Sequence, residues 1–172
     1  MKTELTEIEI DILEFLERGE PVPAAHAYHV RIDCERFKVD TDRPTGQFLL
    51  ELVRKRPCAY ELISEFNHCE NQVVEPHETV DLRQHGLKGF LTAHKEIVTV
   101  FFGDQDTPFH IERGEHSVAE IMAVPKDGKT PEGYDLYIEK PGKPPIQLPD
   151  NKPVKIEGCE RFHVQAKSGG SS

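Results

Sequence analysis

The side chains best able to do chemistry in this sequence are its four cysteines and nine histidines. No Cys-x-x-Cys occurs, and the lone Cys-x3-His spacing of Cys159 and His163 falls short of the four-ligand pattern of a structural zinc site. No nucleophile stands beside a base at a known spacing, and there is no P-loop or glycine-rich nucleotide motif. We therefore expect no metal, no cofactor held by the chain and no enzymatic activity of its own.

The C-terminal end offers a different kind of chemistry. The chain ends Gln165-Ala-Lys-Ser-Gly-Gly-Ser-Ser172. Gly169 and Gly170 carry no side chain and accept backbone angles that other residues avoid. Flexible Gly/Ser linkers have the same composition. The tail alone therefore leaves open whether these glycines have a chemical role or form an inert linker.

Composition narrows the class of protein. The 172 residues hold 21 Lys plus Arg against 31 Asp plus Glu, a formal net charge of −10. This balance disfavours nucleic acid as a partner, because phosphate binding needs a basic patch. No apolar run approaches the ~20 residues of a membrane helix, and the acidic start is unlike a signal peptide. We expect a soluble, cytoplasmic protein with no membrane partner.

The elements that must position the tail occur twice, with a period near 72 residues. The offset is 72 between Thr45 and Ser117 and again between Phe90 and Phe162. Each copy predicts a hairpin (29–39 and 98–111), a helix (48–53 and 118–124), a third strand (61–66 and 134–138), a short strand (78–82 and 152–156) and a final strand (89–91 and 161–164).

Helix signals agree between the copies. Thr45 and Ser117 are N-cap residues by type, and Glu120 completes a capping box with Ser117. Pro57 and Pro125 stop the helices. One helix packed on a mixed sheet with these connections is the β-grasp arrangement, so the sequence predicts an α+β protein with two tandem β-grasp domains.

A short acidic N-terminal helix precedes the first copy. Apolar residues from Leu5 to Leu16 form one helical stripe, Gly19 is a C-cap, and prolines begin a linker. This helix either packs on the first domain or docks on a partner, and the sequence leaves the two open. The expected organisation is residues 1–25 for the helix and linker, 26–94 and 95–166 for the domains, and 167–172 for the tail.

Three phrases resemble the bacterial multiubiquitin family. They are Arg43-Pro-Thr-Gly-Gln-Phe-Leu-Leu-Glu-Leu52, Glu78-Thr-Val-Asp-Leu-Arg83 and Ser117-Val-Ala-Glu-Ile121. The resemblance covers about residues 26–172. It implies a ubiquitin-like modifier of a bacterial ubiquitination-like (Bil or Bub) system, with a role in antiphage defence.

The resemblance also implies how the tail is used. A processing peptidase would cut between Gly170 and Ser171, and an activating enzyme would then adenylate the Gly170 carboxylate with ATP. Transfer through a conjugating enzyme would end in an isopeptide bond to a target protein. Lys167, Ser168 and Gly169 would be read as the tail passes through these enzymes.

A surface on the second copy is a further candidate for partner recognition. His163 lies between the core residues Phe162 and Val164, so it should face outward on the last strand. With Arg161, Gln165 and Tyr137 it would form a face read by conjugating enzymes. An ordinary solvated sheet face is the alternative.

Two other functions stay open. The first copy ends Gly89-Phe-Leu-Thr-Ala-His-Lys95 without a Gly-Gly, so the chain is one two-domain unit. The tandem domains could be a binding scaffold that is never conjugated. A sulfur carrier is the second alternative, although such carriers are single domains that end at Gly-Gly.

Overall fold

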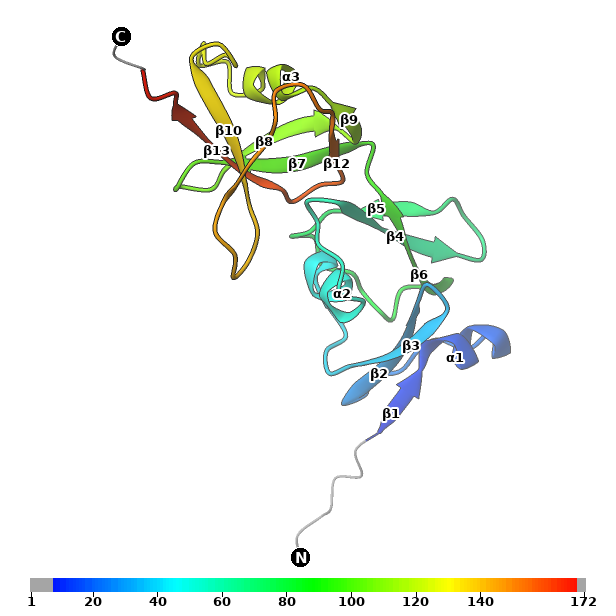
Figure 1. Ribbon diagram of the computed structural model, residues 1–172. Coiled ribbons are helices and arrows are strands. Elements are labelled where there is room, and N and C mark those ends of the chain that lie inside the picture. The colour runs from blue at the N-terminus through cyan, green and yellow to red at the C-terminus, as the bar shows by residue number, and fades with distance from the viewer. Residues whose placement is uncertain (1–7, 170–172) are drawn as a thin grey trace, which may run out of the picture. The chain divides into compact units, whose positions relative to one another are not determined.

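The structure is a computed structural model, and it describes residues 8–169. The chain divides into two compact units between His94 and Lys95 (Figure 1). Within the described residues, no helix is both long and apolar enough to cross a bilayer.

The first domain packs two helices against a mixed sheet. Its elements are β1 (Glu9–Asp11), α1 (Ile12–Arg18), β2 (Ala27–Ile32), β3 (Glu35–Val39), α2 (Gly46–Leu52), β4 (Tyr60–Phe66), β5 (Gln72–Val74) and β6 (Leu87–His94). Strand β2 pairs antiparallel with β3, and its C-terminal end pairs parallel with β6. The sheet continues from β6 to β4 and β5, and β1 adds parallel to the start of β2.

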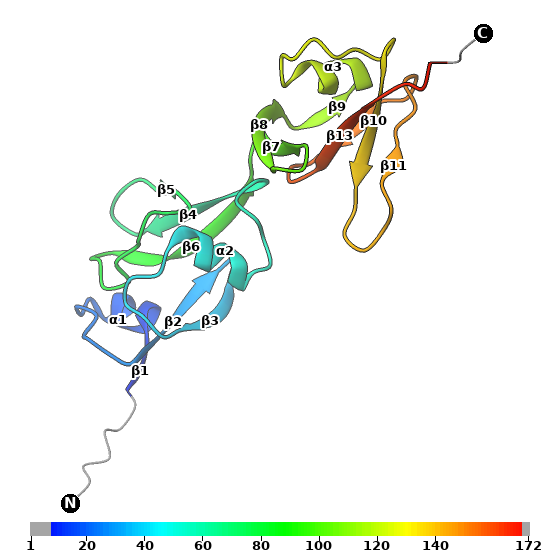
Figure 2. The ribbon, with the colours of Figure 1, turned by 90° about the vertical axis from the view of Figure 1, so that its left-hand side faces the viewer.

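The second domain repeats this order. Its elements are β7 (Ile97–Phe102), β8 (Thr107–Glu112), β9 (Gly114–His116), α3 (Val118–Ala123), β10 (Tyr134–Glu139), β11 (Ile146–Gln147), β12 (Val154–Ile156) and β13 (Arg161–Ala166). The main sheet runs β8-β7-β13-β10-β11 (Figure 2), and β9 pairs with β12 (Figure 1). Both sheets set the hairpin beside the last strand, with the last strand in the centre. The predicted α+β fold of two tandem β-grasp domains is confirmed.

Local signals explain where the central helices begin. The Thr45 hydroxyl accepts a hydrogen bond from Phe48 N at 3.2 Å. Ser117 and Glu120 form the predicted capping box, in which each side chain accepts a hydrogen bond from the other residue's backbone N–H. Helix α3 ends at Ala123, and its C-cap residue Val124 stands directly before Pro125. These caps satisfy backbone groups that the first helical turn leaves free.

Each domain has its own apolar core. The first is built on buried residues that include Val30, Leu49, Leu50, Leu62, Leu82 and Phe90. The second is built on Val98, Val100, Val118, Ile121, Leu136 and Phe162. In both, one face of the helix covers one face of the sheet, so alternate strand residues point away from the core.

The N-terminal segment differs from the predicted helix. The helix begins at Ile12 instead of Leu5, because residues 9–11 form β1 and Asp11 caps α1 by accepting from Leu13 N at 3.1 Å. Ile10 and Ile12 are buried in the first core. Their period-two alternation is a strand signal that the helical stripe concealed. Leu5 lies outside the described residues.

The short strand predicted at residues 78–82 is reduced to one bridge. Thr79 pairs with Thr45, and Val80 N donates to Pro44 O at 2.9 Å. The equivalent segment of the second domain forms β12, which pairs with β9. Val80 and Leu82 are buried. Both domains therefore bury apolar residues of this segment, but only the second domain pairs the segment as a strand.

Candidate functional site

The last strand of the second domain carries most of the predicted site residues. Arg161, His163 and Gln165 alternate with the core residue Phe162, so they share the outer face of β13. Tyr137 of β10 lies directly opposite His163 in the register. The sheet therefore gathers all four predicted surface residues on one face.

Two of these residues form an aromatic pair. The Tyr137 and His163 rings stack with centroids 4.9 Å apart and planes inclined by 3°. Nδ1 of His163 lies 3.2 Å from Oε1 of Glu139, and it donates when that nitrogen carries the proton. The His163 side chain is 27% exposed. The pair presents a flat, half-buried platform of the kind found at protein interfaces.

The other two residues differ in how firmly they are held. Arg161 forms an ion pair with Asp106, and its guanidinium carbon lies 5.4 Å from the centroid of the Phe101 ring. It thereby ties the β7–β8 turn to the last strand. Gln165 is exposed and lies opposite Asp135.

The tail leaves the domain at Lys167. Its backbone N–H donates to Gly133 O at 2.9 Å, and Nζ lies 3.1 Å from Oδ2 of Asp150. Ser168 and Gly169 are exposed, and a Cβ placed on Gly169 would meet no atom within 4 Å. The predicted cleavage and conjugation residues, Gly170 and Ser171, lie outside the described residues.

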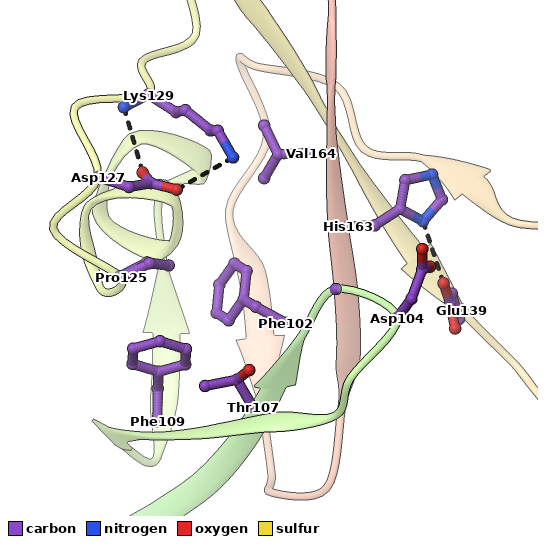
Figure 3. Close-up of a pocket in the computed structure, with 11 residues that line it drawn as sticks. Phe102, Asp104, Thr107, Phe109, Pro125, Asp127, Lys129, Glu139, His163 and Val164 are labelled. Carbon is purple, nitrogen blue, oxygen red and sulfur yellow. Dashed lines mark hydrogen bonds and ion pairs between the residues drawn. The ribbon is translucent and has the colours of Figure 1, made fainter.

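A groove beside β13 was missed by the sequence reasoning. It measures about 480 Å³ and lies between the β7–β8 turn, the segment after α3 and β13 (Figure 3). Its lining is Phe102, Gly103, Asp104, Thr107, Phe109, Pro125, Asp127, Lys129, Glu139, His163 and Val164. Alternation of apolar residues could predict the strands. It could not predict the space that the β7–β8 turn leaves beside β13.

One wall of the groove is a fixed ion pair. Nζ of Lys129 lies 3.1 Å from Oδ2 of Asp127, and the Lys129 N–H donates to Oδ1. Burial opposes ionisation of Asp127, but these hydrogen bonds outweigh it and hold the pKa of the carboxyl below its ordinary value. The wall therefore keeps its charge above acidic pH.

Across residues 8–169, no group of three or more His, Cys, Asp or Glu side chains is arranged to hold an ion.

The comparisons agree with the class that the fold defines. Two sheets of β-grasp order, each with a central helix between the hairpin and the third long strand, define a tandem β-grasp protein. Residues 28–95 match the multiubiquitin family, so the first domain is similar to a multiubiquitin domain. No curated protein sequence matches the chain.

Proposed function

We propose that this chain is a ubiquitin-like protein modifier that is joined to amines of target proteins through Gly170. The observation that supports the proposal is the way β13 runs into an exposed tail, in a chain whose first domain matches the multiubiquitin family. Among residues 8–169, Lys167 is the last residue that bonds to the domain, and Ser168 and Gly169 beyond it are exposed.

The chemistry proceeds in four steps. A peptidase hydrolyses the Gly170–Ser171 amide and frees the Gly170 carboxylate. The activating enzyme joins that carboxylate to the AMP of ATP and releases pyrophosphate. A cysteine thiolate displaces AMP to form a thioester. A lysine amine of the target then attacks the thioester carbonyl, and the thiol leaves as the isopeptide bond forms.

This chain contributes the substrate, and the partner enzymes contribute the catalytic groups. A tail without side chains suits a channel that leads to ATP, because nothing projects from Gly169 or Gly170. The face of Tyr137, Arg161, His163 and Gln165 is the surface we assign to the conjugating enzyme. A bacterial ubiquitination-like pathway, with antiphage defence as its purpose, is the setting we propose.

The test is conjugation by the products of the neighbouring genes in the presence of ATP. Gly170→Ala should abolish conjugates while the thermal unfolding of both domains stays unchanged, because the described cores are built from residues up to Val164. Gly142→Ala, in an exposed turn, is the matched control and should conjugate as the wild type does. Equal conjugates from Gly170→Ala would contradict the proposal and favour a scaffold that is never conjugated.

A further inference from the structure

The last strand of the second domain has a free edge on one side. Strand β7 ends at Phe102, and the Gly103 N–H makes the next contact with β13 by donating to Phe162 O at 3.0 Å. Val164 continues past this point. Its partner in β10, Leu136, directs its carbonyl away from β13, toward Leu148 N at 2.8 Å. The Val164 N–H and C=O therefore point away from β10, toward the end of β7.

The same edge is closed in the first domain. Asp33 N donates to Phe90 O at 3.0 Å, which is the contact that Gly103 makes with Phe162. The Asp33 carboxylate then accepts the Thr92 N–H at 2.8 Å and the Thr92 hydroxyl at 2.6 Å. Lys55 Nζ lies 2.8 Å from the same carboxylate. Asp33 and Lys55 together occupy the edge beside Thr92.

Among the described residues of the second domain, no side chain makes this contact. Gly103 stands where Asp33 stands, and Val164 stands where Thr92 stands. Within residues 8–169, no group accepts a hydrogen bond from the Val164 N–H. The groove opens at this point, and Val164 forms part of its wall (Figure 3). A strand edge with unpaired backbone groups is a template for another extended chain.

We propose that this edge binds an extended segment of a partner protein by strand addition, with one apolar side chain in the groove and basic side chains flanking it. The apolar side chain would contact Phe102, Phe109 and Pro125, which line the groove. Main-chain hydrogen bonds to Val164 supply the register, and the groove supplies the preference for one side chain.

Charge selects the flanking residues. The lining holds three carboxylates, of Asp104, Asp127 and Glu139, and one lysine. With His163 neutral, the formal charge of the lining is −2, in a chain of −10. A segment with basic residues on both sides of the apolar one complements this rim. The proposal holds whether or not the chain is conjugated through Gly170.

The probe is a synthetic peptide, acetyl-Lys-Val-Lys-Val-Lys-amide, titrated into the full ¹⁵N-labelled chain. We expect shift changes at Val164, Gly103 and Phe109, and slower exchange of the Val164 amide. Gly103→Asp should weaken binding about tenfold, because its carboxylate would take the Val164 N–H that the peptide needs. The variant fits the backbone: Gly103 has φ +73° with open space around it, and Asp33 already adopts φ 51°.

Two matched controls isolate the edge from the charge. Gly142→Asp adds the same carboxylate at a similar φ of +71° with open surroundings in the β10–β11 connection, and it should leave the affinity unchanged. Gly103→Ala also places a Cβ at this positive φ but adds no hydrogen-bond acceptor. It should bind the peptide within about twofold of the wild-type affinity. A peptide with Glu in place of Lys should bind more weakly.

Several results would overturn the proposal. They are equal affinity of Gly103→Asp and wild type, loss of binding in Gly142→Asp, tighter binding of the Glu peptide, or shift changes confined to the first domain. Thermal unfolding of Gly103→Asp shows that the second domain is intact. A failure of conjugation through Gly170 leaves all of these outcomes readable, since none of them uses the tail.

Discussion

The two domains carry the same strand order but treat their last strands differently. In the first, the β2–β3 turn places Asp33 against the edge of β6, where it binds Thr92 and Lys55. In the second, the β7–β8 turn places Gly103 at the equivalent point, and the edge of β13 stays open. The first domain has a carboxylate at this turn position, and it occupies the edge of the last strand. The second domain has no side chain there, which leaves the edge of its last strand available to a partner.

The outer faces of the two sheets differ in a related way. The central cross-strand pair is Ile63 with Leu91 in the first domain and Tyr137 with His163 in the second. The last strand of the first domain, β6, continues through Lys95 into the second domain. The last strand of the second domain, β13, leads into the tail. The sealed edge and the aliphatic face therefore occur in the domain without the tail.

The largest expected effects come from the cores and test whether the domains are independent. Leu49→Ala should destabilise the first domain, and Ile121→Ala the second, by about 2–4 kcal/mol each, because both side chains are fully buried. Urea unfolding followed by residue-resolved NMR separates the two transitions. A loss shared equally by both domains after either substitution would show that they unfold as one unit.

Removing the Asp33 carboxylate tests the comparison between the two strand edges. Asp33→Gly gives the first domain the residue of the second, and it should cost about 1–2 kcal/mol through the lost hydrogen bonds to the Thr92 N–H and Lys55. Asp33→Asn retains an acceptor oxygen and should cost less. Urea unfolding of the first domain measures both variants. An Asp33→Gly domain as stable as the wild type would mean that the contact contributes nothing.

The stability that the Asp33 contacts give the first domain should also depend on pH. Burial opposes ionisation of Asp33, but hydrogen bonds from Lys55 and Thr92 outweigh it and hold the pKa of the carboxyl below its ordinary value. A folded-state pKa below the unfolded value gives stability that is present above the unfolded pKa and lost as pH falls through the folded pKa. Unfolding of the first domain at pH 7, 4 and 3 should show this loss in the wild type and a smaller loss in Asp33→Asn. Parallel curves for the two proteins would contradict it.

The smallest effect concerns the face of the second sheet. Glu139→Gln removes a carboxylate that is 42% exposed and lies beside His163. Exposed pairs of this kind contribute little, so the second domain should change by less than about 0.5 kcal/mol. Urea unfolding checks the value, and a loss above 1 kcal/mol would show that the Tyr137–His163 platform depends on this contact.

The sequence predicted the features that depend on local spacing. The repeat, the caps at Thr45 and Ser117 and the outward position of His163 follow from periodicity and residue type. The strand at residues 9–11 was misassigned because Ile8 and Ile12 fit a helical stripe as well as a strand.

The groove and the open edge depend on geometry that spacing does not contain. The offset of 72 aligns Phe90 with Phe162, but the turn residues Asp33 and Gly103 are 70 apart. Their equivalence becomes visible only in the hydrogen bonds that both backbones make to the last strand. A carboxylate held at positive φ and bonded to a distant amide leaves no periodic signal.

Native-state amide exchange of the full chain tests the comparison most directly, by measuring Thr92 and Val164 in one sample. The Thr92 N–H is bonded to Asp33, and the Val164 N–H has no partner among residues 8–169. We predict that Thr92 exchanges at least about tenfold more slowly than Val164, and that Gly103→Asp slows Val164. Equal protection of the two amides in the wild type would contradict the account, because both edges would then be closed.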